Sequence, residues 1–196
     1  MVNSLAPVRR RLSVEDRRDE IVAVCLRLIG TRDWDTVTMA DIAAEAQVSK
    51  GLLYHYFSAK PELYLAAVRR AATDLAVATT PDPSLSHGER LHDALMAHVN
   101  WIDAHALAYR AVLQGGLSGD LDVQLIVESS RAQVLDRVAW DSGLASISPR
   151  LRIALRGWVG FLEGACLEWL DSKAVTKEEL VRLVASQLPA AIRAGR

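Results

Sequence analysis

The chain has 196 residues and a formal net charge of −1 at pH 7, with 51% hydrophobic and 24% charged residues. This near-neutral charge excludes a protein that coats nucleic acid indiscriminately, because dedicated nucleic-acid domains often have an isoelectric point above about 9. Any DNA binding must come from a small surface with well-placed contacts. The length suffices for one large domain or two small ones with a real core.

Helix is the favoured secondary structure throughout the chain. Alanine and leucine abound, β-branched runs are scarce and there are only 6 prolines, so we predict an all-α fold. No apolar run reaches the roughly 18 residues of a membrane span. Cys25 and Cys166 are far apart, and there is no signal-peptide pattern, which predicts reduced thiols in a cytoplasmic protein.

The N-terminal residues 1–14 are predicted to form a flexible basic arm that includes Arg9, Arg10 and Arg11. Two interpretations stay open, namely a solvated tail or an arm that follows the DNA backbone or enters a minor groove. Helical periodicity begins at Ser13, and we expect a first helix that ends near Thr31.

Two short helices are predicted next. Thr38, with Asp41 three residues later, is an N-terminal capping pattern for a helix over 39–46. A brief break at Gln47 and Val48 precedes Ser49, a good N-cap for a helix over 49–57. Two short helices that meet at a tight turn after a longer helix form a helix-turn-helix unit. We therefore predict a DNA-binding domain over 15–75, with its helix-turn-helix at 38–57.

The helix over 49–57 has two different sides. On a helical wheel Leu53 and Phe57 lie one turn apart on one side, where a core can hold them. The opposite side carries Gly51, Tyr54 and His55, with Lys50 and Leu52 at its edges. A cation and two aromatic groups with polar tips suit the major groove of DNA, which is about 12 Å wide.

A longer helix is expected from Ser58, as its cap, to about Ala78, and the Pro-containing stretch 79–84 is a clear break. The helices expected after it span about 86–104, 105–114, 120–142, 149–171 and 176–194. We assign residues 76–196 to a helical effector-binding and dimerisation domain.

The segment 38–63 resembles the N-terminal signature of the tetracycline-repressor (TetR) family. The matching elements are Thr38 before the second helix, the Ile42-Ala43 pair, the Val48-Ser49 turn, the Gly51-Leu52-Leu53-Tyr54 run, Phe57, and the Ser58-x-Lys60 opening of the next helix. The resemblance implies a homodimeric transcription regulator, usually a repressor, that leaves a palindromic operator when a small molecule enters the larger domain.

The same resemblance implies roles for individual residues. Thr38 corresponds to a hydroxyl that bonds a phosphate, and Lys60 to a lysine that contacts another phosphate. The positions that face bases and backbone correspond to Lys50, Gly51, Leu52, Tyr54, His55 and Tyr56. The chain departs from the family pattern at Gln47, where glycine is usual, and at Tyr56, where histidine is common. The helical wheel places Tyr56 toward the buried edge.

The larger domain contains candidate ligand-binding residues but no pattern that implies a cofactor. As a set, the aromatic residues suit an apolar or aromatic ligand, and Glu163 is the best polar candidate, although it could pair with Arg156 or Arg152. The candidates are Met96, Trp101, His105, Tyr109, Trp158, Phe161 and Glu163. For any one of them plain core packing is the alternative. His87, His92, His98 and His105 do not share one helical face, so we expect no metal site.

The helix over 149–171 is apolar nearly all round, which requires burial nearly all round. Gly157, Gly160 and Gly164 form a narrow stripe along which a second helix can approach closely. We expect this stripe and the final helix to form the dimer as a four-helix bundle, and the alternative is close packing within one chain. The residues expected from the final helix are Leu180, Leu183, Val184 and Leu188.

Two other classes of function remain as alternatives. One is a DNA-binding helical module without a small-molecule effector. The other, less favoured, is an all-α enzyme, because the sequence offers no nucleophile with a plausible base, no phosphate loop and no metal cluster. The expected partners are therefore double-stranded operator DNA, a second copy of the chain and an unidentified small molecule, with no membrane.

Overall fold

The computed structural model describes residues 13–114, 121–144 and 146–195. The elements in chain order are α1 (Val14–Ile29), the 3-10 turn η1 (Trp34–Thr36), α2 (Met39–Glu45), α3 (Lys50–Tyr56), α4 (Lys60–Ala78), α5 (His87–Ala104), α6 (Ala106–Gln114), α7 (Leu121–Asp141), α8 (Pro149–Ser172) and α9 (Lys177–Gly195). Every regular element in these ranges is helical, which confirms the all-α prediction. Residues 1–12 of the expected basic arm lie outside the described residues, whereas Ser13 is the N-cap of α1 and Val14 its first residue.

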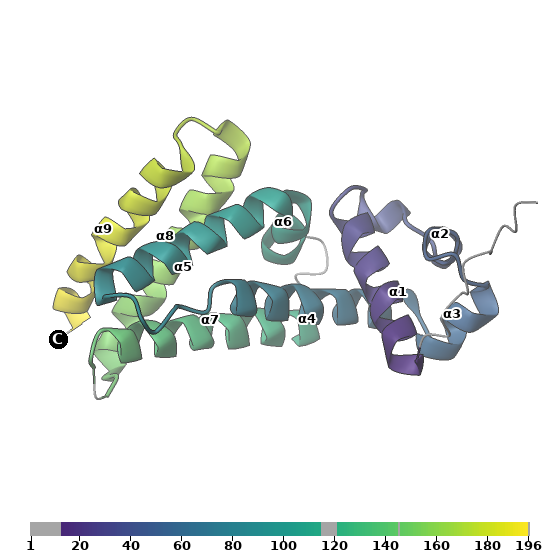
Figure 1. Cartoon of the computed structure of the whole chain (residues 1–196), viewed down its shortest axis with the longest axis horizontal. Coiled ribbons are helices and arrows are strands. Elements are labelled where there is room, and N and C mark those ends of the chain that lie inside the picture. Colours follow the sequence, from purple (N-terminus) through teal and green to yellow (C-terminus); the bar gives the residue numbers. More distant parts are fainter. Residues whose placement is uncertain (1–12, 115–120, 145, 196) are drawn as a thin grey trace, which may run out of the picture.

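The helices form two groups that α4 joins (Figure 1). One group is α1, α2 and α3, at one end of the molecule, and the other is the bundle of α5 to α9. Helix α4 packs on α1 and then runs beside α7 into the bundle. The expected boundary between residues 75 and 76 falls inside α4, which continues unbroken to Ala78.

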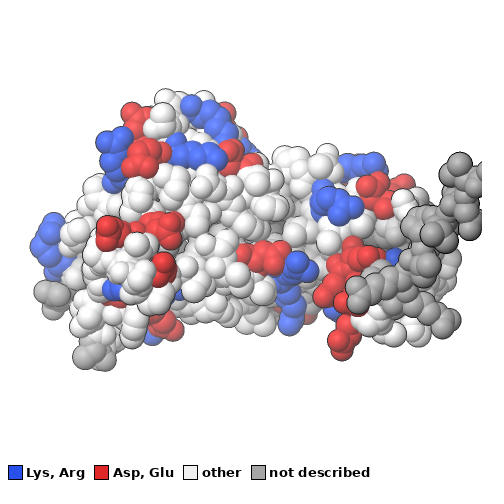
Figure 2. Space-filling view, in the orientation of Figure 1, with Lys and Arg blue, Asp and Glu red and all other residues white. Residues whose placement is uncertain are grey.

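Charged side chains of both signs are interspersed over the face in Figure 2. Blue and red atoms lie next to one another in several places, and uncharged surface lies between these groups in this view. This arrangement agrees with the formal net charge of −1. Among the described residues, no helix is long and apolar enough to cross a membrane.

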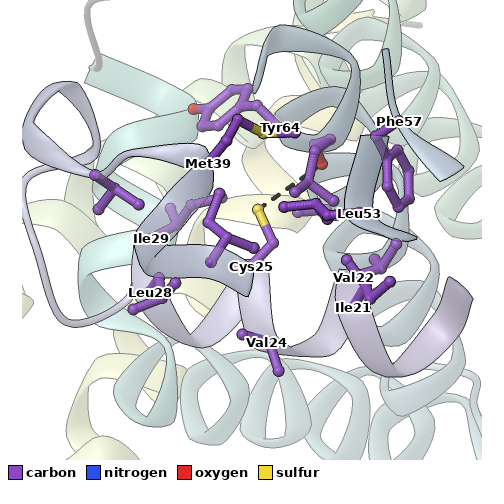
Figure 3. Close-up of a cluster of buried hydrophobic side chains, with 14 of the residues drawn as sticks. Ile21, Val22, Val24, Cys25, Leu28, Ile29, Met39, Leu53, Phe57 and Tyr64 are labelled. Atoms are coloured by element: carbon purple, nitrogen blue, oxygen red, sulfur yellow. Dashed lines mark hydrogen bonds between the residues drawn. The ribbon is translucent and has the colours of Figure 1, made fainter. Parts of the chain in front are cut away.

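The N-terminal core holds α3 from its inner side. Leu53 and Phe57 are fully buried, and they point into the cluster around Ile21 and Cys25 of α1 (Figure 3). The Cys25 thiol lies 3.8 Å from the carbonyl oxygen of Leu63, and burial raises the pKa of this thiol to about 12. Cys25 is therefore a core residue in its neutral form.

Two elements of the larger unit also contribute to the N-terminal core. Ala108 of α6 and Val123 of α7 are each 2% exposed and belong to the same cluster as Leu53. The bundle core is a second cluster, in which Trp158 and Leu155 of α8 pack against Val181 of α9. The first core therefore draws residues from α6 and α7, in the middle of the chain, as well as from the N-terminal helices.

The start of α4 differs from the expected cap. The N-cap position belongs to Ala59, which has no side-chain hydrogen bond to the helix. Ser58 instead donates from its backbone nitrogen and its hydroxyl to Oε2 of Glu62, at 2.8 and 2.9 Å. A carboxylate in the first turn is favoured by the helix dipole, so Glu62 secures this end of the helix from within.

The turn between α2 and α3 requires a left-handed residue. Gln47 has a φ of +53°, a conformation that glycine adopts freely and that L residues adopt at a cost of about 1 kcal/mol. Two backbone hydrogen bonds hold Gln47 in this conformation. The backbone nitrogens of Gln47 and Val48 donate to the carbonyls of Ala44 and Ala43. Glycine would adopt this turn without the side-chain penalty.

We predict that Gln47→Gly raises the free energy of unfolding by about 1 kcal/mol, because it relieves the left-handed strain. Chemical denaturation of the purified protein measures the change. Gln187→Gly on the exposed side of α9 is the matched control, and it should destabilise by about 1 kcal/mol because glycine is a poor helix former. Equal effects of the two substitutions would refute the strain at Gln47.

Candidate DNA-binding face and internal cavity

The first turn of α2 is closed by a reciprocal capping box. The backbone nitrogen of Asp41 donates to Oγ1 of Thr38 at 3.2 Å, and the backbone nitrogen of Thr38 donates to Oδ2 of Asp41 at 2.8 Å. The Thr38 hydroxyl also donates to Oδ2 of Asp41 at 2.6 Å. These bonds hold the pKa of the Asp41 carboxyl below its usual range. A phosphate at Thr38 would therefore compete with Asp41 for the hydroxyl proton.

Helix α3 presents the side that the sequence predicts. Its N-cap Ser49 accepts from the backbone nitrogen of Leu52 at 3.1 Å. The side away from the core is open, with Tyr54 52% exposed and Leu52 38% exposed. The other exposed residues of this side are Lys50, Gly51 and His55. One short helix thus offers a cation, a phenol and an imidazole together on a rigid support.

Tyr56 lies at the edge of this face, as the helical wheel indicates. It is half-buried and packs against the N-terminal core. Its ring also makes an edge contact with His55, with centroids 5.5 Å apart. Tyr56 therefore helps to fix the orientation of its neighbour and has less free surface than Tyr54.

Lys60 is not a free lysine in this conformation. Its ammonium donates to the carbonyl of Trp34 at 2.5 Å and to that of Asp35 at 3.4 Å. The ammonium also lies 4.6 Å from the centroid of the Trp34 ring. Lys60 thus ties the first turn of α4 to η1, and one of its three donors remains for a phosphate. The sequence predicts the phosphate contact but misses this structural role.

A cavity of about 130 Å³ lies within the larger unit, between α4, α5, α6, α7 and α8. Three of the seven predicted ligand residues line it, namely Trp101, Tyr109 and Glu163. The walls are mostly apolar, and a stripe of alanines and Leu75 on α4 forms one side. This agrees with the general character of small-molecule sites, in which a few polar groups interrupt apolar walls.

The other four predicted residues do not line this cavity. Trp158 faces α9, where its indole nitrogen donates to the carbonyl of Val184 at 3.0 Å. Phe161 is 40% exposed on the outer side of α8. His105 stacks on Trp101 and donates from Nδ1 to its carbonyl at 2.8 Å, while Met96 packs against the bundle core. A role for these four residues in ligand binding therefore has no support from this cavity.

Two buried polar atoms at the cavity have no hydrogen-bond partner among the described residues, the Nε2 of His98 and the hydroxyl of Tyr109. Their rings meet edge to face with centroids 6.0 Å apart. Burial lowers the pKa of His98 from 6.5 to about 4, so its imidazole is neutral at pH 7. Unsatisfied buried polar groups cost free energy, and the protein carries that cost at this cavity.

Glu163 is paired, but its partner is not one of the arginines expected from the sequence. Both of its carboxylate oxygens accept from Arg131 of α7, each at 2.7 Å. Arg131 also donates to Glu128 at 2.6 Å. This fork between α7 and α8 raises the pKa of Arg131 further above its usual value. The charge of Glu163 is therefore neutralised within the protein.

A second arginine of α7 reaches the end of α4. Nη1 of Arg137 donates to the carbonyl of Thr79 at 2.7 Å and to its hydroxyl oxygen at 3.1 Å. Sequence reasoning missed both Arg131 and Arg137, because a spacing of six residues puts them about 120° apart on a helix and gives no sign that both line one cavity. It considered His98 only as a metal ligand. Among the described residues, no group of three or more metal-ligating side chains is close enough to hold an ion.

The predicted dimer residues divide into two sets. Leu180, Val184 and Leu188 are at most 5% exposed and pack within the bundle core of a single chain, which corrects their assignment. Gly157 and Gly164 are exposed, and a Cβ added at either would meet nothing within 4 Å. Leu183 is 49% exposed, and Gly160 is half-buried. The glycine stripe is therefore free in the monomer.

A short capped helix pair, a strained tight turn and an exposed face on the second helix define a helix-turn-helix DNA-binding protein. The family model described as bacterial regulatory proteins, tetR family, matches residues 21–67. A second model, described as a tetracyclin repressor-like C-terminal domain, matches residues 87–191. The chain belongs to the TetR family of DNA-binding transcriptional regulators, which are not enzymes.

Known proteins agree with this assignment. The transcriptional activator FasR of Mycolicibacterium smegmatis is 28% identical over 182 residues, which are 87% of this chain and 80% of FasR. The regulator BetI of Agrobacterium fabrum is 46% identical over 59 residues, which are 30% of this chain and 29% of BetI. A tetR-family regulator from Streptomyces coelicolor superposes with a TM-score of 0.86 at 29% identity, covering 94% of this chain and 83% of that one.

We predict that acid destabilises the protein through His98. The unfolded chain takes up a proton on this histidine near pH 6.5, whereas the folded chain resists protonation down to about pH 4. The associated stability is complete above pH 6.5 and falls as the pH drops toward 4, by on the order of 3 kcal/mol. Denaturation midpoints between pH 7 and pH 4.5 measure this loss.

The variant His98→Phe tests the assignment because it removes the buried imidazole and keeps an aromatic ring. Its free energy of unfolding should depend less on pH over that range than that of the wild type. His55→Phe, which changes an exposed imidazole on α3, should keep the wild-type dependence. Parallel curves for His98→Phe and the wild type would contradict the prediction.

Proposed function

We propose that this chain acts as a cytoplasmic homodimer that represses transcription from a palindromic operator and leaves the operator when a largely apolar small molecule enters the cavity. The observation that carries the proposal is the double role of α4. Its first half is packed in the core that holds α3, and its second half forms a wall of the cavity. Occupation of the cavity can therefore act directly on the DNA-binding unit.

The exposed surface of α8 and α9 supports the dimer. Ile153, Phe161 and Leu183 are 74%, 40% and 49% exposed, which is unfavourable in water for large apolar side chains. The glycine stripe beside them leaves room for a second helix to approach. A two-fold axis at this surface would pair α8 and α9 of each chain in a four-helix bundle.

In a dimer, a movement of α4 changes the fit of the protein to its operator. Two recognition helices must fit half-sites about 34 Å apart along one face of the duplex. A small pivot of each α4 changes the separation of the two α3 helices and so the affinity for the operator. Binding linkage then requires reciprocity, so that ligand weakens DNA binding and DNA weakens ligand binding by the same factor.

Two alternatives are distinguished by simple observations. The relative FasR is named an activator, so this chain could activate rather than repress transcription. The position of its operator relative to a promoter decides between these directions. A DNA-binding module without an effector would show no rise in melting temperature with any small molecule, since only ligands that bind the folded state stabilise it.

The decisive experiment for the proposed function is selection of bound fragments from random DNA by the wild-type protein. We expect enrichment of a palindrome with half-sites one helical turn apart, because a two-fold dimer presents the same face of α3 twice. No enrichment over random sequence would overturn the proposal.

We predict that Lys50→Ala weakens binding to the selected palindrome by about 1–3 kcal/mol and relaxes the sequence preference, because Lys50 is exposed at the start of α3. Fluorescence anisotropy with the palindrome and with random DNA measures both effects. Lys177→Ala in α9, which removes the same charge far from α3, is the control and should leave both affinities unchanged. An unaltered preference in Lys50→Ala would exclude base contact.

We predict that Gly160→Leu gives a folded monomer. An added Cβ at this position meets only the end of the Arg156 side chain at 3.9 Å, so the isolated chain tolerates it, whereas a partner helix would clash with it. Sedimentation and circular dichroism report mass and helicity. Gly88→Leu in α5, also without close neighbours, is the control and should leave the oligomeric state unchanged. A persistent dimer in Gly160→Leu would count against the interface.

A further inference from the structure

We propose that the cavity takes an amphipathic carboxylate, with an apolar chain lying along α4 and α7 and an acidic head group bound by Arg137. The proposal rests on the effector role of the cavity given above. It adds the chemical class of the ligand and the residue that binds its head group. It follows from the shape of the cavity, from the charge balance of its two arginines and from the contact between Arg137 and Thr79.

The lining of the cavity extends along much of α4. Its residues on α4 recur at three- and four-residue steps from Val68 to Thr79, which corresponds to about 16 Å of helix. The stripe between these ends consists of Ala71, Ala72, Leu75 and Ala76. Three of these four residues are alanines, so this wall carries little side-chain volume. The volume of about 130 Å³ is below the several hundred Å³ of a site for a bulky compound, so a slender chain fits better.

The two arginines that line the cavity differ in their charge balance. Arg131 is bonded to the carboxylates of Glu163 and Glu128. Arg137 has no carboxylate partner among the described residues, and its only bonds there are to Thr79. Asp141, one turn further along α7, is bonded instead to Arg90 at 2.6 Å. Arg137 is therefore the guanidinium at this cavity whose charge the protein leaves uncompensated.

A half-buried guanidinium without a counter-ion is a costly arrangement unless a ligand completes it. Nη1 of Arg137 is occupied by Thr79, but its Nε and Nη2 groups have no partner among the described residues. These two groups form the edge of a guanidinium that matches a carboxylate with two parallel hydrogen bonds. The head group would therefore be planar and anionic.

The other polar groups that line the cavity indicate which end of the ligand lies at Arg137. His98 is neutral, Tyr109 keeps its proton because burial raises its pKa, and the Glu163 carboxylate is nearby on α8. An anionic head would gain no charge partner there. The chain of the ligand therefore points toward His98 and Tyr109, and its head lies at Arg137.

The same contact connects the head group to α4. Thr79 follows the last residue of α4, and its carbonyl is one of the free acceptors at the end of the helix that a cation stabilises. A carboxylate on the free Nε and Nη2 edge would share the guanidinium with Thr79, and its pull on Arg137 would act on the contact that joins α7 to the end of α4. Recognition of the head group would therefore bear directly on α4.

Three probes with the same chain of ten carbons test the head group on the full-length wild type at pH 7. They are decanoate, 1-decanol and decylamine, and their affinities are measured by the shift in melting temperature and by tryptophan fluorescence, since Trp101 lines the cavity. We expect decanoate to bind at least about tenfold more tightly than 1-decanol, and decylamine to bind most weakly. Equal affinities, or a preference for decylamine, would overturn the proposal.

Variants of Arg137 test whether this residue binds the head group. Arg137→Gln should lose the about tenfold preference for decanoate over 1-decanol, whereas Arg137→Lys should retain part of it. Arg152→Gln, on the exposed side of α8, removes one charge elsewhere and should keep the wild-type preference. A preference that survives in Arg137→Gln would refute the role of Arg137. If Arg137→Gln does not fold, the Arg137→Lys variant and the wild-type probe series still test the role of Arg137 in the head-group preference.

DNA binding is measured separately, so that the two proposals can fail independently. Decanoate should weaken binding of the wild type to its selected palindrome, and 1-decanol at equal concentration should do so less. A protein that selects a palindrome but shows no head-group preference would refute only the ligand class. A protein that prefers decanoate but selects no DNA would refute the proposed function and leave the ligand class standing.

Discussion

The structure depends on α4 being one unbroken helix shared by two units. Leu63 and Val68 are buried in the same cluster as Leu53 of α3, while the stripe that ends at Thr79 lines the cavity. A helix resists bending because each turn is closed by backbone hydrogen bonds, so a displacement at one end reaches the other. Ala108 and Val123 brace the N-terminal core from α6 and α7, which couples the cavity walls to that core by a second route.

Three of the polar groups suited to contacts with DNA or ligand are held by an internal partner. Thr38 is bonded to Asp41, Lys60 to Trp34, and Arg137 to Thr79. Such bonds satisfy polar groups that would otherwise be unpaired, and they fix side-chain positions in advance. A phosphate or a carboxylate offers each of them a charged acceptor, and hydrogen bonds to charged groups are stronger than neutral ones. The internal partners thus keep these residues in place and can be displaced.

The near-neutral charge of the chain is consistent with this design. Both signs are interspersed on the visible face, so attraction to any phosphate backbone is weak and the small face of α3 must provide the selectivity (Figure 2). Duplication of that face in a dimer would raise affinity without a larger basic surface. The free glycine stripe and the exposed apolar residues of α8 are where such a duplication has room.

The sequence alone determined the helix-turn-helix unit, because caps, turn and periodicity lie within short stretches of chain. The inward position of Leu53 and Phe57 and the special turn at Gln47 follow from local spacing, and the structure has them in these conformations. Only the tertiary structure decided the contacts between distant helices. Arg131 meets Glu163 across 32 residues and Arg137 meets Thr79 across 58. Periodicity identifies the apolar face of α9 but not what covers it, and Leu180, Val184 and Leu188 pack inside their own chain. The physical reason is that one amphipathic pattern suits a core and an interface equally, and only the packing of the other helices selects between them.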